Sequence, residues 1–153
     1  MKFYPVNLNI KGKVCVVIGG GKVAERKAKN ILLCGGKVRL ISPKLTLKLA
    51  ETAEQGKIDY IKCTYTPETL KGAYLVYAAT SNRKTNSKIA KDAREKGIWV
   101  NVCDSVKESS FILPAVLRKN GVTFAVSTDG ISPKKAVRMR DKLDEAMTWP
   151  NLS

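Results

Sequence analysis

The chain has 153 residues, of which 44% are hydrophobic, and this predicts one compact domain with a small appendage rather than a disordered chain. Its 28 Lys and Arg residues outnumber 13 Asp and Glu residues, and the net charge of +15 indicates a polyanionic partner or a generally solvated surface. The basic residues are spread along the chain without an RNP-like motif or a zinc finger, so we expect no nucleic-acid partner.

Apolar runs alternate with helical periodicities between residues 14 and 102. Val14 to Ile18 is an unbroken apolar run, as expected of a strand buried on both faces of a parallel sheet. Ala24, Ala28 and Ile31 then recur at helical spacing, and Gly35 ends that helix. We expect the remaining elements to be strands at 37–41, 58–61, 74–79 and 98–102, and helices at about 45–54 and 85–96. Strands that alternate with helices predict an α/β fold with a parallel sheet.

The pattern changes after residue 102, where two strand-like runs precede a final helix at about 133–147. Asn120 and Gly121 join the runs at 111–119 and 122–127, and this dipeptide favours a β-hairpin with a type I′ turn. Pro114 cannot donate to a strand ladder, so its strand should lie at an edge or carry a bulge.

The first predicted strand leads directly through glycines into the first helix, in the pattern G-x-G-x-x-A. Gly19 allows a sharp turn, Gly21 lets the backbone approach a pyrophosphate, and Ala24 keeps the helix close to the strand. The N–H groups of the helix N-terminus then face the phosphates, together with the positive end of the helix dipole. This context predicts a Rossmann-like nucleotide site, and a glycine turn without a ligand is the alternative.

No carboxylate ends the second predicted strand, where a ribose-binding Asp or Glu is expected. Arg39 and Lys44 would suit the 2′-phosphate of NADP, although Arg39 alternates with core residues and suits a surface position equally. Ser42 and the backbone at Pro43 and Lys44 could instead bind a ribose without charge. These residues leave the choice between NAD and NADP open.

Ligands of open α/β sheets lie beyond the carboxyl ends of the strands. Ala79 and Thr80 follow the fourth predicted strand, and Asn101, Val102 and Asp104 lie at the end of the fifth. Asp104 is the only carboxylate directly at the end of a core strand, which makes it the candidate general acid or base. Its alternative role is that of a turn or helix cap.

A hydroxyl-rich loop precedes the final helix and contains Ser127, Thr128 and Ser132. Such a loop suits the carboxylate or phosphate groups of a ligand. Capping of the helix by Ser132 alone is an equally good interpretation of that residue.

Several motifs together resemble the precorrin-2 dehydrogenase/sirohydrochlorin ferrochelatase family, the N-terminal module of siroheme synthases. The resemblance spans nearly all of residues 4–145 apart from a divergent stretch around 45–72, and its most specific runs are "GGGKVAERKA", "AAT", "NVCD", "FILP" and "STDGISP". It implies NAD-dependent oxidation of precorrin-2 to sirohydrochlorin, in some members followed by insertion of iron or cobalt. A regulatory domain that senses NAD(H) without catalysis is the alternative from another functional class.

The resemblance also implies roles for individual residues. The cofactor would be NAD, bound by Gly19, Gly21, Lys22, Val23, Ala24, Ser42, Pro43, Lys44, Ala79, Thr80, Asn101 and Val102. Asp104 matches the family's acidic residue implicated in dehydrogenation and chelation. The anionic tetrapyrrole, precorrin-2 or sirohydrochlorin, would be bound by Ser127, Thr128, Ser132, Lys134 and Arg138, of which the last two supply positive charge.

The same resemblance divides the chain into three regions and implies a homodimer. We expect an NAD-binding Rossmann-like domain at 1–104, a hairpin dimerisation region at 105–132, and the start of a short or truncated helical region at 133–153. Four dispersed cysteines without any histidine predict no metal site. The sequence shows no signal peptide, and no apolar run approaches the length of a membrane span, which is ~20 residues. We therefore expect a cytoplasmic protein with no membrane segment.

Overall fold

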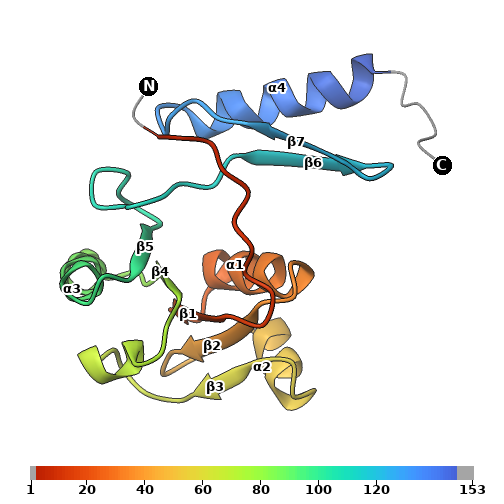
Figure 1. Ribbon diagram of the computed structural model, residues 1–153. Coiled ribbons are helices and arrows are strands. Elements are labelled where there is room, and N and C mark those ends of the chain that lie inside the picture. Colours follow the sequence, from red (N-terminus) through yellow and green to blue (C-terminus); the bar gives the residue numbers. More distant parts are fainter. Residues whose placement is uncertain (1–2, 148–153) are drawn as a thin grey trace. The chain divides into compact units, whose positions relative to one another are not determined.

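The computed structural model describes residues 3–147, and these form two units. The larger unit is Val6–Phe111, and the smaller unit combines residues 3–5 with residues 112–147. Residues 148–153, which the sequence assigns to the C-terminal helical region, lie outside the described residues. Figure 1 labels the α-helices and strands of both units.

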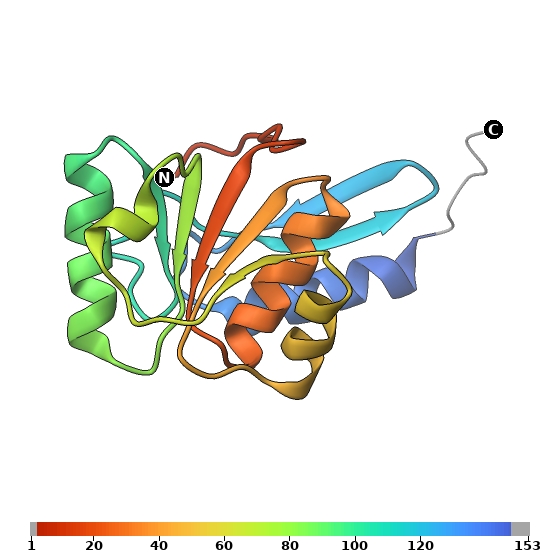
Figure 2. The ribbon, with the colours of Figure 1, turned by 90° about the horizontal axis from the view of Figure 1, so that it is seen from below.

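A five-stranded parallel sheet forms the centre of the larger unit (Figures 1 and 2). Its order is β3-β2-β1-β4-β5, and the strands are β1 (Val14–Ile18), β2 (Lys37–Ile41), β3 (Asp59–Ile61), β4 (Leu75–Ala78) and β5 (Trp99–Val102). The strand order reverses between β1 and β4, which is the switch point where doubly wound sheets open a crevice for ligands. The predicted Rossmann-like α/β fold is confirmed.

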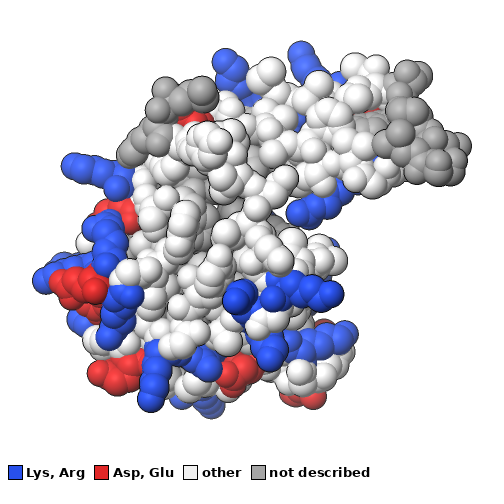
Figure 3. All heavy atoms as spheres, viewed as in Figure 1, with Lys and Arg blue, Asp and Glu red and all other residues white. Residues whose placement is uncertain are grey.

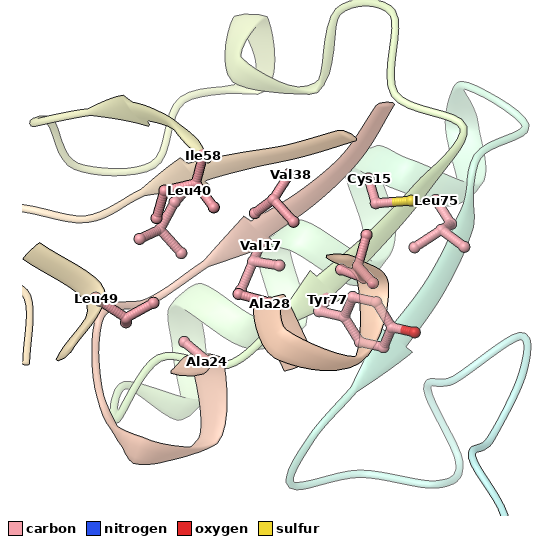
Figure 4. Close-up of a cluster of buried hydrophobic side chains, with 11 residues drawn as sticks. Cys15, Val17, Ala24, Ala28, Val38, Leu40, Leu49, Ile58, Leu75 and Tyr77 are labelled. Atoms are coloured by element: carbon pink, nitrogen blue, oxygen red, sulfur yellow. The ribbon is translucent and has the colours of Figure 1, made fainter. Parts of the chain in front are cut away.

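Helices cover both faces of this sheet because the strands bury apolar side chains on both sides. The helices α1 (Lys22–Leu33) and α2 (Leu47–Glu54) pack on one face, where Val17, Leu40 and Tyr77 belong to the cluster in Figure 4. The helix α3 (Arg83–Glu95) and the short 3-10 helix η1 (Pro67–Leu70) pack on the other face. The continuous apolar runs at β1 and β4 therefore reflect a sheet that is buried on both sides.

Capping side chains set the starts of two helices and account for differences from the predicted bounds. Thr46 accepts a hydrogen bond from the N–H of Leu49, so α2 begins two residues later than predicted. Asn82 accepts a bond from the N–H of Thr85, and α3 begins two residues earlier than predicted.

The smaller unit contains an antiparallel hairpin and one helix (Figure 1). The strands β6 (Ala115–Lys119) and β7 (Val122–Val126) are joined by Asn120 and Gly121, whose φ angles of 48° and 76° are both positive. Two positive φ angles in a two-residue loop are the signature of the predicted type I′ turn. The strand β6 begins at Ala115, directly after Pro114, because proline cannot donate to the ladder. The helix α4 (Pro133–Ala146) follows, and Lys119 pairs with its Asp144 at 3.5 Å.

Basic side chains are distributed over several elements of the face in view in Figure 3, with acidic side chains among them. Among residues 3–147, no helix is both long enough and apolar enough to cross a membrane. The same part of the chain holds no group of three His, Cys, Asp or Glu residues arranged to bind a metal ion.

Candidate functional site

Four loops meet the carboxyl edge of the parallel sheet. They follow β1, β2, β4 and β5. The residues of the larger unit that the sequence assigns to a site lie in these loops, in the first turn of α1 or at the end of β5. Because all five strands are parallel, these loops emerge at the same edge.

The glycine loop after β1 is closely packed at its first two glycines and open at its third. A Cβ on Gly19, whose φ is 127°, would lie 2.3 Å from the carbonyl oxygen of Ala79. A Cβ on Gly20 would lie 1.9 Å from the carbonyl oxygen of Lys44. A Cβ on Gly21 would meet nothing within 4 Å. The first two glycines therefore let neighbouring loops pack against the backbone, and Gly21 leaves space for a ligand.

The N-terminus of α1 has no capping side chain, and its N-cap residue is Gly21. The three other α-helices that the structure describes are each capped by a side chain, from Thr46, Asn82 and Ser132. The N–H groups of the first turn of α1, from Lys22 onward, are thus left for a ligand or solvent, together with the positive end of the helix dipole. This is the arrangement that binds pyrophosphate in nucleotide-binding folds.

The loop after β2 lacks a carboxylate, and the polar side chains of Ser42 in this loop and of Arg39 in β2 are bonded within the fold. The Ser42 hydroxyl donates to the carbonyl oxygen of Lys44 at 2.7 Å, so it shapes the loop, and its direct contact with a cofactor stays a prediction. Arg39 donates to Asp59 at 3.0 Å and to the carbonyl oxygen of Lys71 at 2.9 Å. These bonds hold the Arg39 guanidinium group against β3 and the loop before β4. The side chains of Pro43 and Lys44 are exposed.

A buried amide that the sequence analysis did not single out joins the loops after β4 and β5. Asn86 is fully buried, and its Oδ1 accepts from the N–H of Thr80 at 3.2 Å and from the Thr80 hydroxyl at 2.7 Å. Its Nδ2 donates to the carbonyl oxygen of Thr80 at 3.0 Å and to Oδ2 of Asp104 at 3.1 Å. The signal in the sequence is a polar residue at inner-face spacing with the buried Ile89, Ala90 and Ala93.

Asp104 is the partly exposed end of this network. Its side chain is 41% exposed, and Arg83 approaches Oδ1 at 3.6 Å while Asn86 occupies Oδ2. Arg83 in turn pairs with Glu108, which also accepts from the Ser87 hydroxyl at 2.7 Å. The Asp104 carboxylate is therefore held in place on one side and open on the other, which suits a group that accepts a proton from a ligand or orients it.

The other predicted residues at this edge mainly pack in the core or bond to neighbouring backbone. The buried Asn101 donates to the carbonyl oxygen of Phe111 at 3.0 Å, and Val102 packs in the core. Ala24 is fully buried against the sheet, as predicted for the residue that keeps the helix close to β1. Val23, by contrast, is 42% exposed in the first turn of α1.

One buried lysine on α1 was also not predicted from the sequence. Lys27 is 8% exposed, and its Nζ lies 5.1 Å from the ring centroid of Tyr77. Burial lowers the pKa of Lys27. The signal in the sequence is its place between Ala24 and Ala28, both of which face the core.

The predicted substrate residues form a separate group in the smaller unit. Ser127 accepts from the N–H of Asp129 at 3.2 Å, and Thr128 Oγ1 accepts from the N–H of Ser132 at 3.0 Å. The Ser132 side chain caps α4, which is the alternative role that the sequence suggested for it. The exposed Lys134 and Arg138 lie one turn apart on that helix.

Known proteins resemble this chain in sequence over most of its length. The chain is 37% identical over 144 residues to siroheme synthase 1 of Aeromonas salmonicida, and the match covers 94% of this chain and 31% of the relative. It is 39% identical over 145 residues to the siroheme synthase of Nitrosomonas eutropha, with 94% and 30% covered. The chain thus spans about a third of the length of these curated relatives.

A solved structure shares the fold over almost the whole chain. The structure of "SirC, precorrin-2 dehydrogenase" aligns with a TM-score of 0.83 at 25% identity, covering 95% of this chain and 72% of that chain. The predicted resemblance to siroheme synthases is confirmed by these matches. A family model described as NAD(P)-binding matches residues 6–115, and the chain belongs to this NAD(P)-binding family.

Proposed function

We propose that this chain is an NAD-dependent dehydrogenase that oxidises precorrin-2 to sirohydrochlorin on the route to siroheme. One observation carries the proposal. The open glycine loop and Asp104 lie at the same edge of the sheet. The backbone of Gly19 packs against Ala79, and hydrogen bonds of Asn86 connect the adjacent Thr80 to Asp104. The similarity to siroheme synthases and to SirC supports the choice of substrate.

The residues at the edge fit NAD. The uncapped N-terminus of α1 and the open space at Gly21 suit its pyrophosphate, and the exposed loop at Pro43 and Lys44 suits its adenosine ribose. The bonds of Arg39 to Asp59 and to the Lys71 carbonyl group remove one of the two cations that could bind the 2′-phosphate of NADP, which supports NAD as the cofactor. When bound, NAD supplies the hydride acceptor.

The protein contributes orientation and electrostatics to the reaction. Oxidation of precorrin-2 would transfer one hydride to bound NAD and release one proton, so that the products balance as sirohydrochlorin, NADH and a proton. Asp104 accepts this proton or holds the macrocycle in place, and Asn86 and Arg83 fix its carboxylate.

The smaller unit has two proposed roles, in substrate binding and in dimerisation. Lys134 and Arg138 with the hydroxyl groups of Ser127, Thr128 and Ser132 suit the carboxylate side chains of a tetrapyrrole. The apolar Ile131 and Met139 are 87% and 49% exposed, which supports contact with a second copy in a cytoplasmic homodimer. Metal insertion into sirohydrochlorin, a lyase activity, is a second proposed reaction, in which Asp104 would help to deprotonate the pyrrole nitrogens.

The alternative function is that of a domain that senses NAD(H) without catalysis. Such a domain requires the glycine loop but has no need of Asp104 held by Asn86. The comparison of Asp104→Ala with the wild-type protein separates the two. We expect loss of precorrin-2 turnover with NAD affinity within about twofold of wild type, because Asp104 is partly exposed and lies in the loop after β5.

Calorimetry with NAD and anaerobic turnover of precorrin-2 measure the two effects. Loss of NAD binding in Asp104→Ala would assign Asp104 a structural role, and unchanged turnover would exclude it from the reaction. Addition of Co(II) to sirohydrochlorin with either protein tests chelation separately.

A further inference from the structure

Lys27 is a buried cation that the proposed reaction has not used. It lies on α1 with 8% of its surface exposed, and its Nζ is 5.1 Å from the Tyr77 ring centroid. Within residues 3–147 its ammonium group forms no ion pair and no hydrogen bond. The π face of Tyr77 is therefore its main electrostatic partner in this part of the chain.

An aromatic ring offsets only part of the free energy of burying an ammonium group. Burial lowers the pKa of Lys27, and the neighbouring charge of Arg26 acts in the same direction. Buried charges in proteins are normally paired or bind an ion. The charged form of a lysine in this setting is costly to bury, and an anion from outside the chain would stabilise it.

The surroundings of Lys27 place it near the carboxyl edge of the sheet. Side chains on a helix lean toward the helix N-terminus, and the N-terminus of α1 lies at that edge. Tyr77 pairs in register with Asn101 on β5. Cys103, the exposed residue that follows β5, lies close enough that its thiolate form would raise the pKa of Lys27. The ammonium group thus lies between α1 and β4, near the residue that follows β5.

We propose that Lys27 binds one carboxylate side chain of the anionic substrate, an inference that rests on the proposed function. A carboxylate supplies the missing counter-charge and accepts a hydrogen bond from the ammonium group. Unlike the exposed Lys134 and Arg138, Lys27 is held by packing against Tyr77, so it fixes the position of the macrocycle relative to the nucleotide loop.

Lys27→Met tests this role because it removes the charge and keeps an unbranched apolar side chain. We expect the midpoint of thermal unfolding to stay unchanged or rise, since the variant no longer buries an unpaired charge. We expect the affinity for sirohydrochlorin to fall about 10- to 100-fold, the usual effect of losing one charged hydrogen bond. Affinity for NAD should stay within about twofold. Lys29→Met, at an exposed position on the same helix, is the matched control and should change none of these quantities.

The possible outcomes separate the inference from the proposed function. Wild-type protein that oxidises precorrin-2, together with Lys27→Met that binds sirohydrochlorin normally, would overturn the inference and leave the function standing. Weaker binding of NAD but not of sirohydrochlorin would show that the anion is the pyrophosphate and would also overturn it. Lower thermal stability in both Lys27→Met and Lys27→Gln would make Lys27 a structural residue. Wild-type protein that neither binds nor oxidises a tetrapyrrole would remove both proposals.

Discussion

Asn86 offers a way to disturb Asp104 without touching either the glycine loop or the carboxylate itself. Its side chain makes four hydrogen bonds, three to Thr80 and one to Asp104. Alanine at this position leaves the backbone N–H and C=O of Thr80 without their partners. Because an unsatisfied buried polar group costs about 1–3 kcal/mol, we expect a loss of about 2–4 kcal/mol in the free energy of unfolding.

Asn86→Asp separates the positioning of Asp104 from simple loss of packing. The aspartate keeps the shape and the acceptor for Thr80, but it sets a second carboxylate at the position now 3.1 Å from Asp104 Oδ2. Two carboxylates at this distance cannot both ionise without strong repulsion, so they share a proton as the pH falls. The protonated acid then donates to Asp104, as the amide does. We therefore expect the stability deficit of this variant relative to wild type to shrink with decreasing pH.

Urea unfolding of wild type, Asn86→Ala and Asn86→Asp across a range of acidic to neutral pH measures these differences. Turnover of precorrin-2 by the same proteins at neutral pH should fall in both variants. An Asn86→Ala protein with wild-type stability and wild-type turnover would refute the view that this amide holds Asp104. A stability deficit of Asn86→Asp that does not depend on pH would refute the electrostatic part.

Two further predictions concern the glycine loop and a buried thiol. Gly21→Ala should keep its stability or gain up to about 1 kcal/mol, because the φ of −90° at Gly21 suits alanine. Calorimetry should nevertheless show a lower affinity of this variant for NAD. Gly20→Ala should lose about 3 kcal/mol of stability, because its Cβ clashes with the carbonyl oxygen of Lys44. Equal NAD affinities of Gly21→Ala and wild type would contradict the assigned pyrophosphate site. Burial, with a smaller effect of Cys34, raises the pKa of Cys15 to about 11 from its ordinary value of 9.0. The folded state then holds the proton longer than the unfolded state, so stability is full below the ordinary pKa and falls as pH rises toward about 11. Urea unfolding of Cys15→Ala should show a shallower alkaline slope than wild type, since Cys103, Tyr65 and Tyr77, whose pKa values are also raised, still contribute. Equal slopes would refute the assignment.

The sequence predicted the sheet well because its strands are encoded locally. Continuous apolar runs at β1 and β4 follow directly from burial on both faces, and the hairpin follows from the Asn120-Gly121 pair. The 3-10 helix η1 was not predicted, because four residues are too few to show a helical period.

The site was predictable where it depends on spacing and not where it depends on long-range contacts. The glycine loop and Asp104 could be identified from their places at the ends of strands. Asn86 bonds to residues 6 and 18 positions away, and helical spacing alone does not distinguish a buried amide from a surface one. Lys27 is similar, since its burial depends on Tyr77 from a distant strand.

The most direct test is anaerobic incubation of the wild-type protein with precorrin-2 and NAD. Absorption spectroscopy follows NADH and sirohydrochlorin in the same sample, and NADP in place of NAD tests the choice of cofactor. We predict that NADH and sirohydrochlorin form in equal amounts, and more slowly with NADP. Folded protein that binds NAD but forms neither product would contradict the proposed dehydrogenase and favour a domain that only senses the nucleotide.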